Sequence, residues 1–133
     1  LARTERLGDL VQGAIEREGL EPRTLVVIAD RYTAASRLAY ALHRRLGDDA
    51  PLVTSGASLV GDRKSAYDYW PETDPRTVRA ETVLFLGGAS ARKWTRRFDM
   101  ATITPMTDAP DPIFGGLYLA RGYAGPKASE GDR

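Results

Sequence analysis

The chain has 133 residues, of which 42% are hydrophobic and 28% are charged, a balance typical of one folded domain with a genuine core. The formal net charge is +1, so charge alone gives no reason to expect nucleic acid or an anionic membrane as a partner. The absence of cysteine excludes disulfides and thiolate chemistry, and the single histidine, His43, excludes a metal site built from several histidines of one chain.

The first predicted element is an amphipathic helix with Thr4 as its N-cap and Gly19 as its stop. Its apolar residues recur at spacings of three and four and so share one face: Leu7, Leu10, Val11, Ala14 and Ile15. Residues 24–29 follow as an unbroken aliphatic run, which predicts a strand covered on both faces, as in the centre of a parallel sheet. A second helix is expected over residues 33–46, which gives the strand–helix order of a βαβ unit.

The rest of the chain predicts further strands and one short helix. The strands are expected at residues 51–54, 81–86, 101–106 and 113–123, and the helix at residues 91–98. Pro105 places its strand at an edge of the sheet, because proline cannot donate to a neighbouring strand. A turn rich in proline and aspartate joins the last two strands and predicts an antiparallel hairpin.

The elements together predict an α/β domain over residues 1–125. We expect three layers, with a mostly parallel sheet, helices on both of its faces and a C-terminal antiparallel hairpin. Residues 126–133 are polar and are expected to form a disordered tail. The chain begins at Leu1 rather than at methionine, and we expect it to be a piece of a longer protein. No apolar run is long enough to span a bilayer as a helix.

Candidate binding residues gather where the predicted parallel strands end, because open α/β sheets bind ligands beyond the carboxyl ends of their strands. Three segments should meet there: Asp30-Arg31-Tyr32, residues 55–70 and Gly87-Gly88-Ala89-Ser90. Asp30 is either a polar contact for a ligand or a cap for the second helix. The glycine segment is either an anion cradle or a tight turn.

The long connection between the second and third strands holds the other candidate site. It combines cations with aromatic rings: Arg63, Lys64, Tyr67, Asp68, Tyr69 and Trp70. Aromatic faces stack on sugar rings and cations pair with phosphate, so one interpretation is a sugar or phosphate site. The other is that Trp70 and one tyrosine fold the loop onto the core. No nucleophile–base pair or metal-ligating cluster stands out, so no catalytic residue, metal or cofactor is predicted.

Several motifs, taken in chain order, resemble one family. They are Ala-Asp-Arg-Tyr at residues 29–32, Ala-Ser-Arg-Leu-Ala-Tyr at residues 35–40, Tyr-Asp-Tyr-Trp-Pro at residues 67–71, the apolar strand at residues 83–86 and Leu-Tyr-Leu-Ala-Arg-Gly-Tyr-Ala-Gly at residues 117–125. In this order and spacing they resemble the extracytoplasmic soluble domain of bacterial polyprenol-phosphate-sugar glycosyltransferases. That family is related to the dolichyl-phosphate-mannose-protein mannosyltransferases.

The resemblance implies a polytopic membrane enzyme that transfers a sugar from polyprenyl phosphate to a protein or glycan acceptor. The implied location is the extracytoplasmic face of the membrane. The catalytic acidic residues of that family lie in loops between transmembrane helices, so this domain is expected to be inactive alone. Its expected role is to bind the acceptor or the donor head group, with the membrane-embedded part of the parent enzyme as its partner.

The positions expected to bind are Asp30, Arg31, Tyr32, Arg63, Lys64, Tyr67, Asp68 and Trp70. No cofactor and no nucleic acid partner is expected. The alternative interpretation is a free-standing α/β module that binds a sugar or a nucleotide and catalyses nothing.

Overall fold

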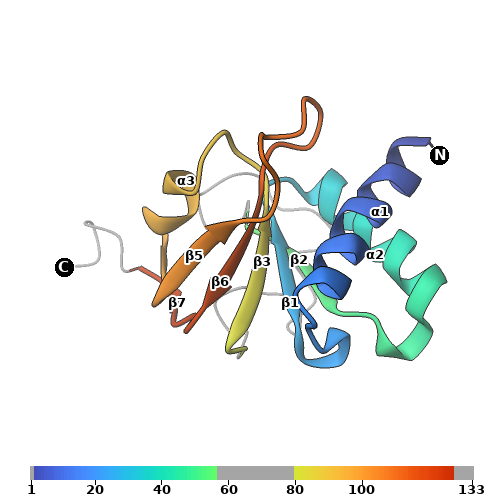
Figure 1. The fold of residues 1–133 in the computed structure, drawn as a ribbon, viewed down its shortest axis with the longest axis horizontal. Helices are drawn as coiled ribbons and strands as arrows, with labels where there is room; N and C mark the ends of the chain where they lie inside the picture. The colour runs from blue at the N-terminus through green and yellow to red at the C-terminus, as the bar shows by residue number, and fades with distance from the viewer. Residues whose placement is uncertain (1, 57–79, 128–133) are drawn as a thin grey trace.

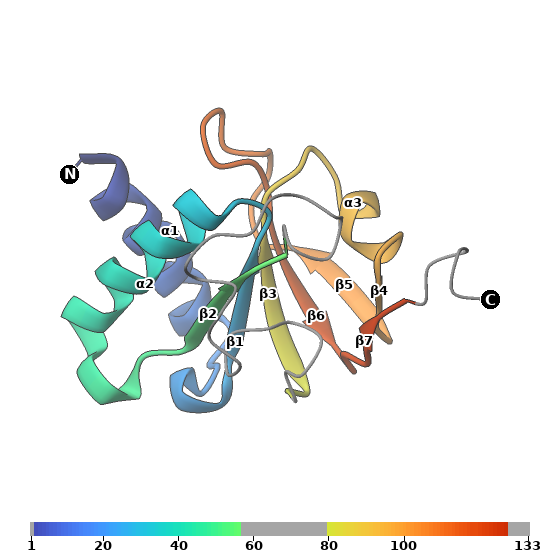
Figure 2. The ribbon, with the colours of Figure 1, turned by 180° about the vertical axis from the view of Figure 1, so that it is seen from behind.

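The computed structural model describes residues 2–56 and 80–127, which form a mixed α/β domain (Figures 1 and 2). The helices are α1 (Ala2–Arg17), α2 (Tyr32–Leu46) and the single turn α3 (Arg92–Thr95), with 3-10 turns η1 (Pro22–Thr24) and η2 (Gly47–Asp49). The strands are β1 (Val26–Ala29), β2 (Leu52–Ser55), β3 (Thr82–Leu86), β4 (Phe98–Asp99), β5 (Thr102–Pro105), β6 (Leu117–Arg121) and β7 (Gly125–Pro126). No helix in these two described ranges is both long and apolar enough to cross a bilayer.

The main sheet has five strands in the order β2-β1-β3-β6-β5, and β4 and β7 form a second sheet of two strands. β1 pairs in parallel with β2 and with β3, whereas β6 is antiparallel to both β3 and β5. β6 is therefore the one strand of the five that runs against the others. The predictions of a mostly parallel sheet and a C-terminal antiparallel hairpin are confirmed, and β5 lies at an edge, as Pro105 indicated.

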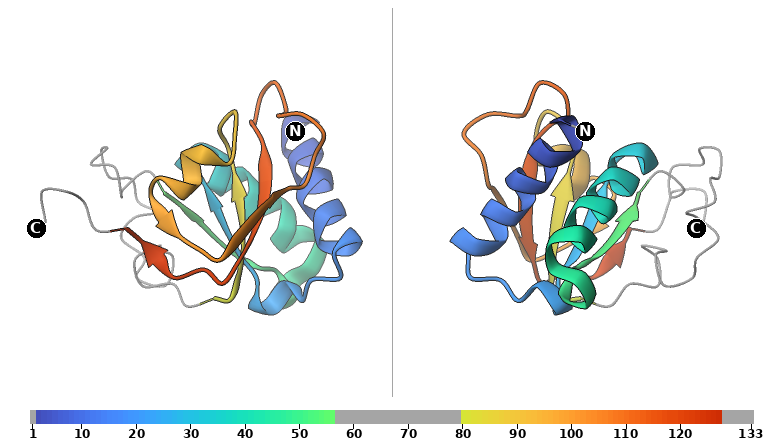
Figure 3. Two further views of the ribbon diagram at one scale, coloured as in Figure 1. Left: turned by 60° about the vertical axis from the view of Figure 1, so that its left-hand side comes forward. Right: turned by 90° about the vertical axis from the view of Figure 1, so that its right-hand side faces the viewer.

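The central strand β1 is buried on both faces, as its aliphatic sequence predicted. On one face, Val27 and Ala29 pack into the core formed with α1 and α2. On the other face, Val26 and Ile28 pack into a cluster that includes Trp94 and aromatic rings of neighbouring elements. Figure 3 shows α1 and α2 side by side against one face of the sheet, with α3 on the opposite side. The alternation of side chains along a strand thus divides the apolar residues between two cores.

The structure confirms the predicted C-terminal end of α1 but not its predicted N-terminal cap. The helix begins at Ala2, so Thr4 lies inside the first turn and the prediction that it caps the helix is wrong. At the other end, Gly19 has a φ of +62°. The N–H of Gly19 donates to the carbonyl of Glu16 at 3.2 Å, and the N–H of Leu20 donates to that of Ile15 at 2.9 Å. These are the two bonds of a Schellman motif, so glycine stops the helix as predicted.

Both α3 and β6 are shorter than the helix at residues 91–98 and the strand at residues 113–123 that the sequence predicts. α3 ends at Thr95, because Phe98 and Asp99 pair with β7 instead of continuing the helix. β6 begins at Leu117, and residues 113–116 belong to the loop that precedes it. Pro126 pairs with Phe98, and the N–H of Lys127 donates to the carbonyl of Arg97 at 2.7 Å. Residues 126 and 127 therefore belong to the folded domain and not to the predicted tail.

Candidate functional site

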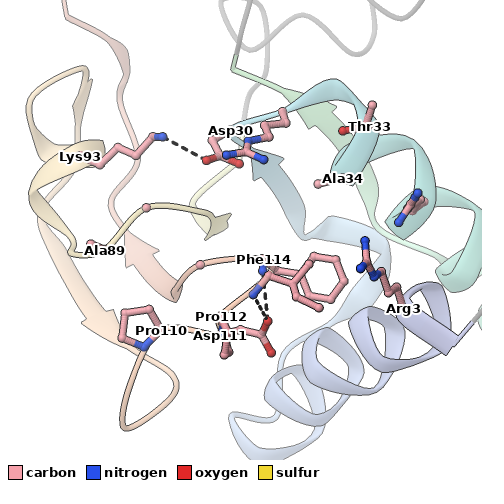
Figure 4. A pocket seen from close by; sticks show the side chains of 15 residues that line it. Arg3, Asp30, Thr33, Ala34, Ala89, Lys93, Pro110, Asp111, Pro112 and Phe114 are labelled. Carbon is pink, nitrogen blue, oxygen red and sulfur yellow. Dashed lines mark hydrogen bonds and ion pairs between the residues drawn. The ribbon is translucent and has the colours of Figure 1, made fainter.

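A cleft of about 560 Å³ opens at the edge of the sheet where β1 and β3 end (Figure 4). Four parts of the chain line it: the start of α1, the β1–α2 junction, the segment from Gly88 to Lys93, and the β5–β6 connection. β6 is antiparallel to β3, so Leu117 at its start pairs with Leu86 at the end of β3. The reversed strand thereby brings the β5–β6 connection to the carboxyl edge of the parallel strands, where α/β sheets bind ligands.

Asp30 follows β1 directly and lies in the wall of this cleft. Its N–H donates to the carbonyl of Leu86 at 2.9 Å, which extends the β1–β3 pairing to the edge of the cleft. Its carboxylate accepts a hydrogen bond from Nζ of Lys93 at 3.0 Å and is only 14% exposed. The N-cap of α2 is Arg31, so Asp30 pairs with a cation of α3 rather than occupying the cap position.

Gly87 and Gly88 allow this ion pair to lie directly on the loop after β3. Gly87 has a φ of +132°, and a Cβ there would lie 2.2 Å from Cγ of Asp30. A Cβ on Gly88, which has a φ of +83°, would lie 2.6 Å from Cδ of Lys93. The indole Nε1 of Trp94 donates to the carbonyl of Gly87 at 2.9 Å and holds the turn in place. The two glycines are therefore required by backbone conformation and by the close approach of side chains.

Asp111 organises the opposite wall, in the β5–β6 connection. Nη2 of Arg6 donates to both carboxylate oxygens of Asp111 at 2.6 Å, and the N–H groups of Ile113 and Phe114 donate to Oδ1 at 2.8 and 3.0 Å. Desolvation raises the pKa of Asp111, but these hydrogen bonds to the charged carboxylate outweigh it and the pKa lies below its ordinary value. The loop also closes on itself through reciprocal backbone bonds of 2.9 Å between Asp111 and Gly115.

The charges that line the cleft do not balance. Its two carboxylates, Asp30 and Asp111, are already paired with Lys93 and Arg6. The remaining charged side chains of the lining are cations that form no ion pair or side-chain hydrogen bond with any described residue: Arg3, Arg31 and Arg37. All three are exposed, and Figure 4 shows Arg3 reaching from α1 toward the cleft. The cleft therefore offers three guanidinium groups to a ligand, and their charges attract an anion.

Of the eight expected binding residues, Asp30 and Arg31 line the cleft. Tyr32 is the first residue of α2, is partly buried and does not belong to the lining. The other five fall within residues 57–79, outside the described part of the chain: Arg63, Lys64, Tyr67, Asp68 and Trp70.

The structure adds lining residues that the sequence did not single out as binding positions: Arg3, Arg37, Asp111 and Phe114. One signal was available for the loop, because Pro110-Asp111-Pro112 and Gly115-Gly116 are turn-forming sequences on both sides of Phe114. No comparable signal exists for Arg3, which reaches the cleft only because α1 packs beside α2.

Comparison of the chain with protein-family models, with curated proteins and with solved structures finds no match. Within residues 2–56 and 80–127, no group of three or more histidine, aspartate or glutamate side chains is placed to hold a metal ion. The cleft has two ion-paired carboxylates, three guanidinium groups without a carboxylate partner in the described ranges, and a wall that includes Phe114.

Proposed function

We propose that this chain is the extracytoplasmic soluble domain of a polytopic membrane glycosyltransferase. The parent enzyme transfers a sugar from a polyprenyl-phosphate donor to a protein or glycan acceptor. The domain is non-catalytic alone, works with the membrane-embedded part of the enzyme, and contributes binding of the acceptor or of the donor head group.

The observation that carries this proposal is the cleft at the carboxyl edge of β1 and β3. Asp30 and Arg31, which belong to the motif on which the family resemblance rests, lie in its lining. The position is where open α/β sheets bind their ligands. Its volume of about 560 Å³ falls within the range of ordinary small-molecule sites.

The side chains of the cleft suit a sugar or a sugar phosphate. Guanidinium groups bind phosphate, carboxylates accept hydrogen bonds from sugar hydroxyls, and the exposed side chain of Ile113 offers an apolar surface for a sugar face. Both carboxylates of the lining are engaged in ion pairs, which suits the positioning of a ligand more than the transfer of a proton. This chemistry supports a binding role for the domain and leaves catalysis to the rest of the enzyme.

The proposal includes the finer architecture expected from the sequence, a three-layer domain with helices on both faces of the sheet. The packing of α1 and α2 on one face and of Trp94 from α3 on the other supports it. The second candidate, a free-standing module that binds a sugar or a nucleotide, uses the same cleft without a membrane partner. An upstream or downstream reading frame with many apolar helices in the parent gene discriminates between the two.

The proposal is tested by assaying the purified chain for sugar transfer from a polyprenyl-phosphate donor and by titrating it with neutral and phosphorylated sugars. We expect no transfer, and amide NMR shifts at the cleft, including Asp30, Arg31 and Gly88. Transfer by the chain alone would contradict its non-catalytic role. Shifts confined to the opposite edge of the sheet would contradict the assignment of the site.

A further inference from the structure

We propose that the cleft binds the phosphate group of a phosphate ester through the guanidinium groups of Arg3, Arg31 and Arg37. This inference rests on the proposed function and makes it more specific. Of the two substrates of such an enzyme, the donor carries the phosphate, so the domain holds the donor rather than the acceptor.

The first support is that these three arginines differ from the paired arginines of the same two helices. Arg6 on α1 forms a two-pronged ion pair with Asp111. Arg45 on α2 lies between Glu5 and Asp9, with Nη2–oxygen distances of 3.1 and 2.9 Å. The three carboxylates Asp111, Glu5 and Asp9 are thus each paired with an arginine other than these three. Arg3, Arg31 and Arg37 face the cleft without a carboxylate partner among the described residues.

The second support is that the three side chains reach one cavity from two of its walls. Arg3 lies near the start of α1, whereas Arg31 is the N-cap residue of α2 and Arg37 lies in that helix. Arg31 is exposed and forms no ion pair with any described residue, so its guanidinium donors can reach a ligand in the cleft. A phosphate has several acceptor oxygens and can bind more than one guanidinium group at once. A neutral sugar acceptor, unlike a phosphate ester, would gain no attraction from the positive charge of this cavity.

The third support is the wall that faces these cations. Ile113 is 42% exposed at the cleft and stands between Pro112 and Phe114, so the β5–β6 connection presents apolar surface beside the arginines. A phosphate ester likewise combines an anionic head with a less polar sugar or prenyl group. Cations on one side and apolar side chains on the other match both ends of such a molecule. Lipid-linked and free sugar phosphates share this chemistry, and the experiment must separate them.

The experiment is an NMR titration of the ¹⁵N-labelled chain with three probes at matched ionic strength. They are a ten-carbon prenyl monophosphate, glucose 1-phosphate and the neutral methyl glucoside. We expect both phosphates to shift the amides of residues 31–34, Gly88 and Ala89, and the prenyl phosphate to bind more tightly. The glucoside should leave these amides unshifted at the same concentrations. Tighter binding of glucose 1-phosphate would overturn the assignment to a lipid-linked donor.

Variants test the assignment of the arginines. Arg3→Gln, Arg31→Gln and Arg37→Gln should each weaken phosphate binding about fivefold, and the triple variant about 100-fold, because each removes one exposed charge contact. The matched control is Arg96→Gln, which removes an exposed arginine just after α3 and outside the cleft lining. An equal loss of affinity in the control would overturn the inference. All these side chains are exposed, so each variant should keep the circular dichroism spectrum of the wild type.

The remaining outcomes separate this inference from the proposed function. If methyl glucoside shifts the cleft amides and neither phosphate binds more tightly, the phosphate assignment fails while a role in binding the acceptor stands. If none of the probes shifts the cleft amides, both the phosphate site and the proposed function fail.

Discussion

Gly87→Ala tests whether the Asp30–Lys93 pair is built on the glycine turn after β3. Gly87 has a φ of +132°, a conformation that L residues rarely adopt, and an added Cβ would lie 2.2 Å from Cγ of Asp30. The new methyl group and the Asp30 carboxylate cannot occupy the same space. Either the carboxylate moves and loses Lys93, or the backbone of the turn moves.

The expected cost follows from three contributions to the free energy of unfolding. Backbone strain at this φ costs about 1–3 kcal/mol. Displacement of Asp30 from Lys93 adds up to about 1 kcal/mol, because the pair is only partly buried. Alanine restricts the unfolded chain more than glycine does, and this lower entropy of the unfolded state offsets about 0.4–1 kcal/mol of the loss. We therefore expect a net loss of about 2 kcal/mol, within the range of about 0–3.6 kcal/mol that these contributions span.

The assay is urea unfolding of a double-mutant cycle that combines Gly87→Ala with Asp30→Ala. In the Asp30→Ala background the carboxylate is gone, so Gly87→Ala should cost about 1 kcal/mol less than in the wild type. Gly19→Ala is the matched control. Gly19 also has a positive φ, +62°, but an added Cβ meets no atom within 4 Å. Its cost should be the same in both backgrounds.

If Gly87→Ala costs the same with and without the Asp30 carboxylate, the side chain of Asp30 does not pack on the turn. The Asp30–Lys93 pair would then not define this wall of the cleft.

Three further predictions concern the packing around the site. Trp94→Phe removes the indole donor of the buried carbonyl of Gly87, and urea unfolding should show a loss of about 1–3 kcal/mol. Arg45→Met leaves Glu5 and Asp9 without their cation, and the free energy of unfolding should fall by about 1–2 kcal/mol. This loss should be smaller in 1 M salt, which thermal melts at two salt concentrations would measure. The lowered pKa of Asp111 implies stability that is fully present above its ordinary value of 3.8 and is lost as pH falls through the folded-state pKa. Asp111→Asn should therefore flatten the pH dependence of unfolding below about pH 4, and an unchanged profile would contradict the assigned ion pair.

The core of the sheet could be predicted from the sequence because its signals are local. An aliphatic run without alternation places β1 at the centre, and the structure buries all four of its residues. Pro105 cannot donate to a neighbouring strand, which indicated the edge position of β5. Gly19 and Gly47 end α1 and α2 with positive φ, as their positions after the apolar pattern indicated.

The extent of α3 and the walls of the cleft could not be predicted, because contacts distant in the sequence decide them. The sequence around Phe98 predicts a helix, but Phe98 pairs with Pro126 in the small sheet. Its ring packs against Phe85, with the two ring centroids 5.2 Å apart. Arg6 and Asp111 are separated by 105 positions, and their ion pair joins the first helix to the β5–β6 connection. Asp111 also fixes the backbone of Ile113 and Phe114, which is why these residues form a loop and not the start of a strand.

The reversal of β6 is what converts a sheet edge into a cleft. With parallel strands alone, the edge beyond β1 and β3 would carry only the β1–α2 and β3–α3 connections. Because β6 runs the opposite way, the loop before it returns to this same edge, and backbone bonds of 2.8 Å join Gly116 to Gly87 and Gly88. The ion pair between Arg6 and Asp111 then ties that loop to α1. The apolar wall is thus attached to both the sheet and a helix, while the side chains of Arg31 and Arg37 are exposed. In the phosphate site that we propose, the apolar part of the ligand would therefore meet a wall that is already in place before binding, which lowers the entropic cost of binding.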